Sequence, residues 1–196
     1  MKFGLLTGLW VVLMAGAFWR FEGSYLLPVR NESGKTLPAP PSRLVRRLDL
    51  ADYKGKIVLV NFWNPTCACS EFAEPHVQHL WNEFSAKGVE FLTVVVTDGD
   101  GSNSALQKAQ THKVPGKLVL DLDGAICKEF GVLAAPAAVI YNRDGQPVYR
   151  GAYNIARFCD NKDTACAEKA LDGLVLGHAV TIKSLPFYGC HVVTPK

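Results

Sequence analysis

The chain has 196 residues, which suits one medium-sized domain with extensions at its ends. Hydrophobic residues make up 48% of it and charged residues 20%, so the composition supplies enough apolar side chains for a core. The net charge of +3 is small, and no basic stripe alternates with aromatic residues, which argues against nucleic-acid binding.

An uncharged, mostly apolar run extends from Phe3 to Trp19. As a helix it would span roughly 25 Å, near the lower limit for crossing a bilayer. Two interpretations stay open. The run is a signal anchor that spans a bacterial inner membrane once, or it is a signal peptide cleaved at Ala15–Ala17, which leaves a soluble periplasmic protein. Both place the rest of the chain outside the cytoplasm, where disulfides persist.

Composition divides the chain into four expected parts. Residues 1–20 are the signal anchor or signal peptide, and residues 21–42, rich in proline and glycine, are a tether. Residues 43–180 carry the hydrophobic periodicity of a folded domain. Residues 181–196 contain scattered prolines and glycines and predict an irregular C-terminal tail.

Two cysteines occupy a predicted junction between a strand and a helix. Ile57–Trp63 is a short apolar run rich in β-branched and aromatic residues, which favours a buried strand. Asn64–Thr66 breaks that strand, and apolar residues recur at helical spacing from Ala68 onward. Cys67 and Cys69 therefore lie at a helix start, where free N–H groups and the helix dipole stabilise a thiolate.

The rest of the domain alternates between strand and helix signals. Further strands are expected at 90–96, 118–122, 137–141 and 148–150, and further helices at 102–112, 125–130 and 165–176. Gly131 is placed to cap the helix before it, and Asn142–Gly145 reads as a hairpin turn. This order predicts an α/β fold with a mixed β-sheet flanked by helices.

The predicted junction resembles the active-site region of the thioredoxin superfamily, most closely its membrane-tethered, extracytoplasmic bacterial members. Trp63 stands four residues before Cys67, and Pro75 stands five residues after Ser70, as in that family's Phe-Trp-Ala-x-Trp-Cys-x-x-Cys pattern and its following proline. By this resemblance Cys67 is the attacking cysteine, and Ser70 occupies the place of the second one. The motif is the atypical Cys-x-Cys-Ser, in which Cys69 is an additional thiol.

A second segment carries the same resemblance. Phe130–Ala137 is similar to the family segment Phe-Gly-Val-x-x-x-Pro, whose proline is cis and lies against the active-site cysteine. The resemblance implies that Pro136 is that cis proline, that Ala135 and Pro136 pair with an extended substrate peptide, and that Trp63 lines the site. Asn61 departs from the pattern, because thioredoxin has a buried acid there, so no carboxylate proton acceptor carries over.

Four more cysteines leave the connectivity open, because six cysteines allow fifteen full pairings. Cys159 has two alternative roles: it resolves an intermediate at the active-site cysteines, or it forms a structural disulfide with Cys166 that closes a small loop. Cys127 reads as a small buried hydrophobe. Cys190 either staples the tail or remains free.

Metal and cofactor signals are weak. No Cys-x-x-Cys pair is present, which argues against a structural zinc site. His76 and His79 are three residues apart, whereas zincins need a spacing of four and a glutamate after the first histidine. We therefore expect no resident metal and no cofactor.

These signals predict an extracytoplasmic thiol-disulfide oxidoreductase. Cys67 would form a mixed disulfide, which Cys69 or another cysteine resolves. The expected partners are protein thiols and disulfides, an unidentified electron donor or acceptor, and the inner membrane through the N-terminal helix; no nucleic acid is expected. The direction of electron flow stays open.

Two alternative functions remain. Thr66 stands three residues before Cys69, which is half of the peroxiredoxin motif Pro-x-x-x-Thr-x-x-Cys, although Phe62 fills the proline position. A thiol peroxidase that uses Thr66 and Cys69 is therefore one alternative. The other is an assembly factor that binds Cu(I) without redox turnover, since two thiolates near His76 suit that ion.

Overall fold

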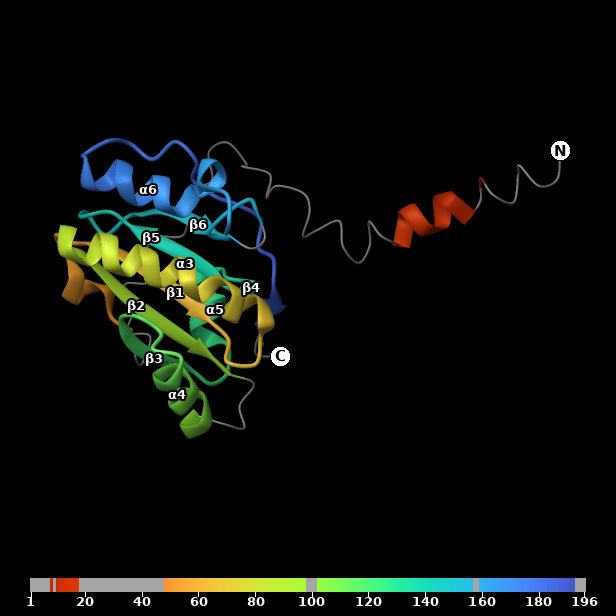
Figure 1. Cartoon of the computed structure of the whole chain (residues 1–196), viewed down its shortest axis with the longest axis horizontal. Coiled ribbons are helices and arrows are strands. Elements are labelled where there is room, and N and C mark those ends of the chain that lie inside the picture. The colour runs from red at the N-terminus through yellow and green to blue at the C-terminus, as the bar shows by residue number, and fades with distance from the viewer. Residues whose placement is uncertain (1–7, 9, 18–47, 98–101, 157–158, 193–196) are drawn as a thin grey trace.

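The computed structural model describes residues 8, 10–17, 48–97, 102–156 and 159–192. A five-stranded sheet with the strand order β3-β2-β1-β5-β6 forms the centre of the domain (Figure 1). The strands are β1 (Ile57–Trp63), β2 (Val89–Val96), β3 (Lys117–Asp121), β5 (Ala137–Tyr141) and β6 (Pro147–Gly151). The first three strands are parallel, whereas β5 and β6 pair antiparallel. This mixed sheet confirms the predicted α/β class.

Helices cover both faces of this sheet. Alternate strand residues point to opposite faces, so the apolar residues of the central strands need a covering layer on each side. The helical elements are η1 (Leu50–Tyr53), α3 (Ala68–Phe84), η2 (Ser85–Lys87), α4 (Ser102–Thr111), α5 (Ala125–Phe130), η3 (Lys162–Thr164) and α6 (Cys166–Val175). One core cluster packs α3 and α6 against Leu59 and Ile140, and a second packs α5 against Val60 and Val139. β1 is consequently buried at every position, as a central strand covered on both sides.

The predicted bounds of β1, α5 and β5 agree with the structure residue by residue. The other predicted strands and helices differ from it by one residue at one or both ends, where element boundaries are least sharp. Gly131 caps α5 as predicted. It has a φ of 63°, and its N–H donates to the carbonyl oxygens of Cys127 and Lys128.

The predicted N-terminal segment lies largely outside the described residues. Within it, residues 10–17 are helical and exposed, well away from the sheet in Figure 1. In the described ranges no helix combines the length and apolar character that a membrane crossing requires. The expected tether at 21–42 lies entirely outside those ranges.

The C-terminal segment first runs along the edge strand β6. The N–H of Arg150 donates to Lys183 O (3.0 Å), and the N–H of Leu185 donates to Arg150 O (3.1 Å). Gly151 makes this approach possible: its φ is +140°, and a Cβ there would lie 2.1 Å from Leu185 O. The segment thereby satisfies backbone groups on an edge that would otherwise be open to other strands.

The same segment then continues to the residues that precede β5. Its strand β7 (Cys190–His191) pairs antiparallel with β4 (Ala134–Ala135) in a separate two-stranded sheet. Phe187 and Val192 are buried in the core cluster that also holds α5. Part of the tail that the sequence predicted to be irregular is therefore anchored to the domain.

Candidate active site

Cys67 lies in the turn that joins β1 to α3. It is the N-cap residue of α3, with extended backbone angles (φ −104°, ψ 114°), and its carbonyl accepts the N–H groups of Ser70 (2.9 Å) and Glu71 (3.2 Å). Asn64-Pro65-Thr66 ends the strand, so the chain turns directly into the helix at this point. The sulfur of Cys67 therefore sits at the positive end of a 17-residue helix.

The topology of the sheet brings this turn beside Pro136. β1 and β5 are antiparallel neighbours in which Phe62 lies opposite Ala137, so the residues after β1 lie beside those before β5. The Ala135–Pro136 bond is cis, as the family resemblance implied. Sγ of Cys67 lies 3.5 Å from Ala135 O, which places the cysteine against the cis-proline segment. This is a contact and not a hydrogen bond, because the sulfur is in a disulfide and carries no proton.

Cys67 is bonded to Cys190, which is 123 residues away along the chain, with a Cα–Cα distance of 5.8 Å. That separation is in the usual range for disulfides. The sequence offered Cys69 and Cys159 as partners for Cys67 and left Cys190 as a staple of the tail or a free thiol. In the structure Cys190 is the disulfide partner of Cys67, the predicted attacking cysteine.

Backbone pairing holds Cys190 in this place. In the register of β4 and β7, Ala135 lies opposite Cys190 and Ala134 opposite His191. The N–H of Val192 donates to Leu133 O at 3.1 Å, which extends the pairing by one residue. An antiparallel strand from the chain itself thus lies along the segment where the thioredoxin resemblance places a substrate peptide.

Cys69 and Ser70 have separate environments in the first turn of α3. Cys69 is exposed and unpaired. Residues two apart on a helix do not face each other, which explains why Cys69 does not reach Cys67 without distortion of the turn. Ser70 is 1% exposed, and its hydroxyl accepts the N–H of Asn64 at 3.2 Å. Ser70 therefore ties the end of β1 to α3 in the place where the family has its second cysteine.

The predicted disulfide between Cys159 and Cys166 is wrong, because both are free thiols in the structure. Hydrogen bonds centred on Asn154 close this loop instead. Its side-chain NH₂ donates to Asn161 O (2.7 Å), and its Oδ1 accepts the Thr164 hydroxyl (2.6 Å). Cys166 is 2% exposed at the start of α6, in the core cluster shared with α3.

Burial makes these thiols poor nucleophiles. Burial, aided by the charge of Asp160, raises the pKa of Cys159 to about 11. Burial also raises the pKa of Cys166. The pKa of Cys127 is raised most strongly, by burial and then by Asp121, which agrees with its predicted role as a small core residue. The role of Cys159 as a resolving thiol stays a prediction.

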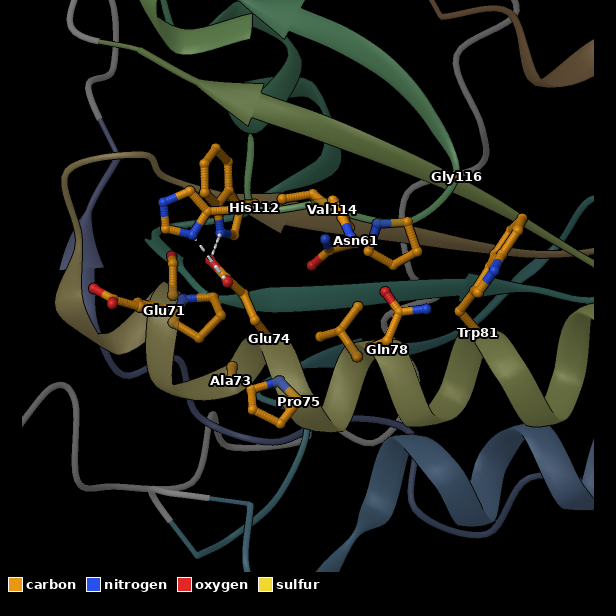
Figure 2. A pocket seen from close by; sticks show the side chains of 16 residues that line it. Asn61, Glu71, Ala73, Glu74, Pro75, Gln78, Trp81, His112, Val114 and Gly116 are labelled. Carbon is orange, nitrogen blue, oxygen red and sulfur yellow. Dashed lines mark hydrogen bonds and ion pairs between the residues drawn. The ribbon is translucent and has the colours of Figure 1, made fainter. Parts of the chain in front are cut away.

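Trp63 borders a cavity of about 570 Å³ together with Ser70 and Pro136. Figure 2 shows this cavity with Glu74 and His112 among its labelled lining residues. The indole N–H of Trp63 donates to Oε1 of Glu74 at 2.9 Å, and Oε2 of Glu74 lies 3.1 Å from Nδ1 of His112. Trp63 is only 3% exposed, so this contact fixes its ring at the cavity wall. The predicted contact of Trp63 with substrate stays a prediction.

Asn61 is buried, and both its side-chain oxygen and its side-chain NH₂ group are hydrogen-bonded. Its Oδ1 accepts the Tyr153 hydroxyl (2.8 Å), and its NH₂ donates to Oγ1 of Thr93 (3.1 Å). The Thr93 hydroxyl in turn donates to Pro115 O (2.7 Å). A neutral network thus fills the place of thioredoxin's buried acid and satisfies its polar groups without a charge.

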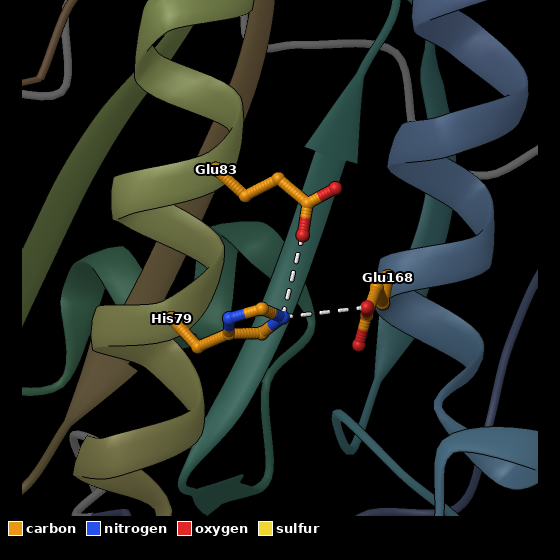
Figure 3. A group of neighbouring side chains, drawn as sticks. All are labelled: His79, Glu83 and Glu168. Carbon is orange, nitrogen blue, oxygen red and sulfur yellow. Dashed lines mark ion pairs between the residues drawn. The ribbon is translucent and has the colours of Figure 1, made fainter.

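One group of potential metal ligands is present in the described ranges, and it lies on the surface between α3 and α6 (Figure 3). Nε2 of His79 is 3.3 Å from Glu83 and 3.5 Å from Glu168. The three ligand atoms lie within 4.8 Å of one another. Direct contacts between the imidazole and the two carboxylates account for this arrangement, and the group contains no cysteine.

Sequence reasoning missed the site roles of Cys190, Glu74 and His112. The aromatic pair Phe187-Tyr188 and the valines after Cys190 have strand propensity, and this signal could have predicted β7. No local signal could have predicted which cysteine it meets. Glu74 and His112 are 38 residues apart, and only the packing of α3 against the end of α4 joins them.

Comparisons with known proteins agree with this architecture. The chain is 27% identical over 142 residues to "Thiol-disulfide oxidoreductase ResA" of Bacillus thuringiensis subsp. konkukian (strain 97-27), which covers 70% of this chain and 81% of that protein. An "uncharacterized conserved protein" from Geobacillus kaustophilus has a solved structure that is 24% identical, with a TM-score of 0.65, over 74% of this chain and 82% of that one.

A solved "Thioredoxin-like Protein in the Oxidized Form" matches with a TM-score of 0.57 and 17% identity, over 73% of this chain and 97% of that one. A family model described as "Domain of unknown function (DUF6436)" matches residues 34–193. The solved structures confirm the predicted thioredoxin-like fold. The curated match places the chain among relatives that are named thiol-disulfide oxidoreductases.

The thiol environments predict an order of alkylation in the oxidised, folded chain. Cys69 should react first because it is exposed and unpaired. Cys159 should react slowly at about pH 8 and speed up as the pH approaches its pKa of about 11, because the thiolate is the reacting form. Cys127 should react last. Peptide mass spectrometry after timed alkylation measures this order.

The unfolded chain serves as control, since these thiols should then react at rates within about threefold of one another. Alkylation of Cys159 as fast as Cys69 in the folded chain would contradict the described environments.

Proposed function

The chain belongs to the family described as "Domain of unknown function (DUF6436)", and we propose that it is a thiol-disulfide oxidoreductase whose redox couple is Cys67 and Cys190. The observation that carries this proposal is the bond between these cysteines, at the N-terminus of α3 and against the cis-proline segment. The relationship to proteins named thiol-disulfide oxidoreductase supports the same activity.

The first step uses Cys67. In the reduced chain its thiolate, stabilised by the helix N-terminus, attacks one sulfur of a substrate disulfide. A bond forms between Sγ of Cys67 and that sulfur, and the substrate S–S bond breaks. The other substrate sulfur leaves as a thiolate and takes a proton from water.

The second step uses Cys190. Its thiolate attacks Sγ of Cys67. This attack re-forms the Cys67–Cys190 disulfide that the structure shows and releases the remaining substrate sulfur as a thiolate. The substrate gains two electrons and the Cys67/Cys190 couple loses them. A dithiol donor must then reduce the couple for another cycle, and the same steps in reverse would oxidise a substrate.

Cys69 is not part of the proposed redox couple. It is an exposed thiol beside the disulfide, and it is the competing candidate for the resolving role. Helix geometry disfavours its bond to Cys67, whereas β7 already delivers Cys190 to that sulfur. We therefore assign the resolving step to Cys190.

The two alternative functions gain no specific support. The Thr66 hydroxyl donates to Oδ1 of Asn64 at 2.8 Å, so it serves the turn before the helix. The group of potential metal ligands in the described ranges lies at His79 and contains no thiol that Cu(I) would prefer.

An extracytoplasmic location belongs to the same proposal. Disulfides persist outside the cytoplasm, and the apolar run at Phe3–Trp19 supplies an export signal in either of its two interpretations. We expect alkaline phosphatase fused after Gly34 to be active in a bacterial host, because that reporter folds only after export. An inactive fusion that stays in the cytoplasm would contradict the location. A mature form that begins near Phe18 would identify the run as a cleaved signal.

Single-cysteine variants test the two roles. Cys67→Ser should lower insulin reduction with a dithiol donor to the uncatalysed rate, because no other thiol has this position. Cys190→Ser should leave the first attack within about threefold of wild type but lower turnover at least about 100-fold, because the mixed disulfide persists. The mixed disulfide is identified by mass spectrometry.

Cys69→Ser is the matched control, since it removes a free thiol from the same site. We expect its turnover within about threefold of wild type. If Cys69→Ser traps the mixed disulfide and Cys190→Ser turns over normally, then the resolving role belongs to Cys69.

A further inference from the structure

We propose that the β4 edge is a shared docking site, where β7 and the cysteine-containing segment of a substrate replace each other during each cycle. The inference rests on the proposed function and names the substrate class of the same site. The favoured substrate segment is extended, has glycine directly before its reactive cysteine, and has an apolar residue two positions after it.

The backbone of β4 can pair with only one strand along this edge. Cys190 lies opposite Ala135, and the N–H of Val192 already donates to Leu133 O. A substrate cysteine that bonds to Cys67 must occupy the place that Cys190 holds, because both meet the same sulfur atom. The mixed disulfide with substrate therefore requires β7 to leave the edge.

The part of the tail that must move is short. Tyr188 anchors the preceding residues, since its hydroxyl donates to Ile155 O at 2.8 Å and also contacts Asn154 O. Phe187 beside it is buried in the core. Beyond this anchor, the contacts that hold β7 include its disulfide, a two-residue ladder and the hydrogen bond from the N–H of Val192 to Leu133 O, and the side chain of Val192 is buried. Reduction removes the covalent bond, and so short a ladder is only marginally stable.

The surroundings of Gly189 show which residue fits on the β4 edge directly before the cysteine. The φ of Gly189 is +134°, and a Cβ there would lie 2.0 Å from Ala135 O and 3.1 Å from Cδ of Pro136. Every other residue carries a Cβ, so a segment that copies the path of the tail needs glycine here. This close approach places the next residue at Cys67.

The surroundings of Val192 show which kind of residue fits on the β4 edge two positions after the cysteine. Side chains alternate along a strand, so the second residue after Cys190 faces the same side as the cysteine. Val192 is 6% exposed and belongs to the core cluster that includes Phe130 and Val132. A charged residue there would lose its hydration without a partner, which disfavours it.

This arrangement couples resolution to product release. When Cys190 attacks Cys67, β7 regains its register with β4, and the substrate segment loses the same backbone partners. The reduced product is thus displaced by the strand that carries the resolving thiol. In the oxidised state the edge is covered by the chain itself.

The test measures how fast Cys67 reacts with synthetic peptides. The protein is the full chain with Cys69→Ser and Cys190→Ser, reduced, so that Cys67 is the reactive thiol at the site and no neighbouring thiol resolves the adduct. Each peptide carries its cysteine as a mixed disulfide with thionitrobenzoate, and attack on the peptide sulfur releases the coloured thiolate. The peptides are Phe-Tyr-Gly-Cys-His-Val and versions with valine in place of glycine or aspartate in place of the last valine.

We expect the parent peptide to react at least about tenfold faster than either altered peptide. Free cysteine amide, as the attacking thiol in place of the protein, should react equally with all three peptides. Equal rates with the protein as well would overturn the substrate inference and leave the proposed function standing. If Cys67 reacts with none of the peptides and also fails with dithio-bis-nitrobenzoate, then the proposed function fails and the inference fails with it.

A second measurement tests the tail in the otherwise unaltered chain. Gly189→Ala should slow the formation of the Cys67–Cys190 bond at least about tenfold, because its Cβ collides with Ala135 O. Gly145→Ala is the matched control, since Gly145 also has positive φ (+75°) but nothing within 4 Å of a Cβ. Equal rates of closure in the two variants would contradict docking of the tail in this register.

Discussion

The bond between Cys67 and Cys190 is the constraint on which the site depends, because it joins the start of α3 to β7 in the C-terminal segment. Antiparallel pairing of β1 with β5 sets the turn at Cys67 beside the cis proline. The C-terminal segment then runs along β6 and returns to β4, where Ala135 lies opposite Cys190. The central sheet thus positions Sγ of Cys67, and the pairing of the C-terminal segment with β4 places Sγ of Cys190 beside it.

The departures from the thioredoxin pattern are consistent with this division of roles. Ser70 replaces the second cysteine of the motif and binds the N–H of Asn64, so the first turn of α3 is held together without a second sulfur. Asn61 replaces a buried acid and is satisfied by Tyr153 and Thr93. The first replacement removes a thiol from the first turn of α3, and the second removes a carboxylate from β1. The partner thiol then comes from a strand that can move, which links the redox state of the site to access to β4.

Much of this architecture could be predicted from the sequence, because local patterns determine it. The apolar run at Ile57–Trp63 has the length and composition of a central strand, and it is buried throughout. Gly131 caps α5 because only a residue tolerant of positive φ continues the chain there. The cis bond before Pro136 followed from the family resemblance and not from local chemistry, since cis bonds are rare even before proline.

The cysteine pairing could not be predicted in the same way, because it depends on contacts over 123 residues. Local spacing favoured a bond between Cys159 and Cys166, yet the hydrogen bonds of Asn154 close that loop and both thiols stay free. The prolines and glycines of residues 181–196 predicted an irregular tail, so the short strand at Cys190–His191 was not expected. Strand pairing at Ala135 selects the partner of Cys67, and a pairing of this kind leaves no pattern in one sequence.

The most direct test of this account is the disulfide map of the oxidised full-length chain. Free thiols are blocked under denaturing, acidic conditions that prevent exchange, and the chain is then digested without reduction and analysed by mass spectrometry. The account predicts one linked pair of peptides, which contain Cys67 and Cys190, and alkylated Cys69, Cys127, Cys159 and Cys166. A map in which Cys67 is linked to Cys69 or Cys159, with Cys190 alkylated, would contradict it.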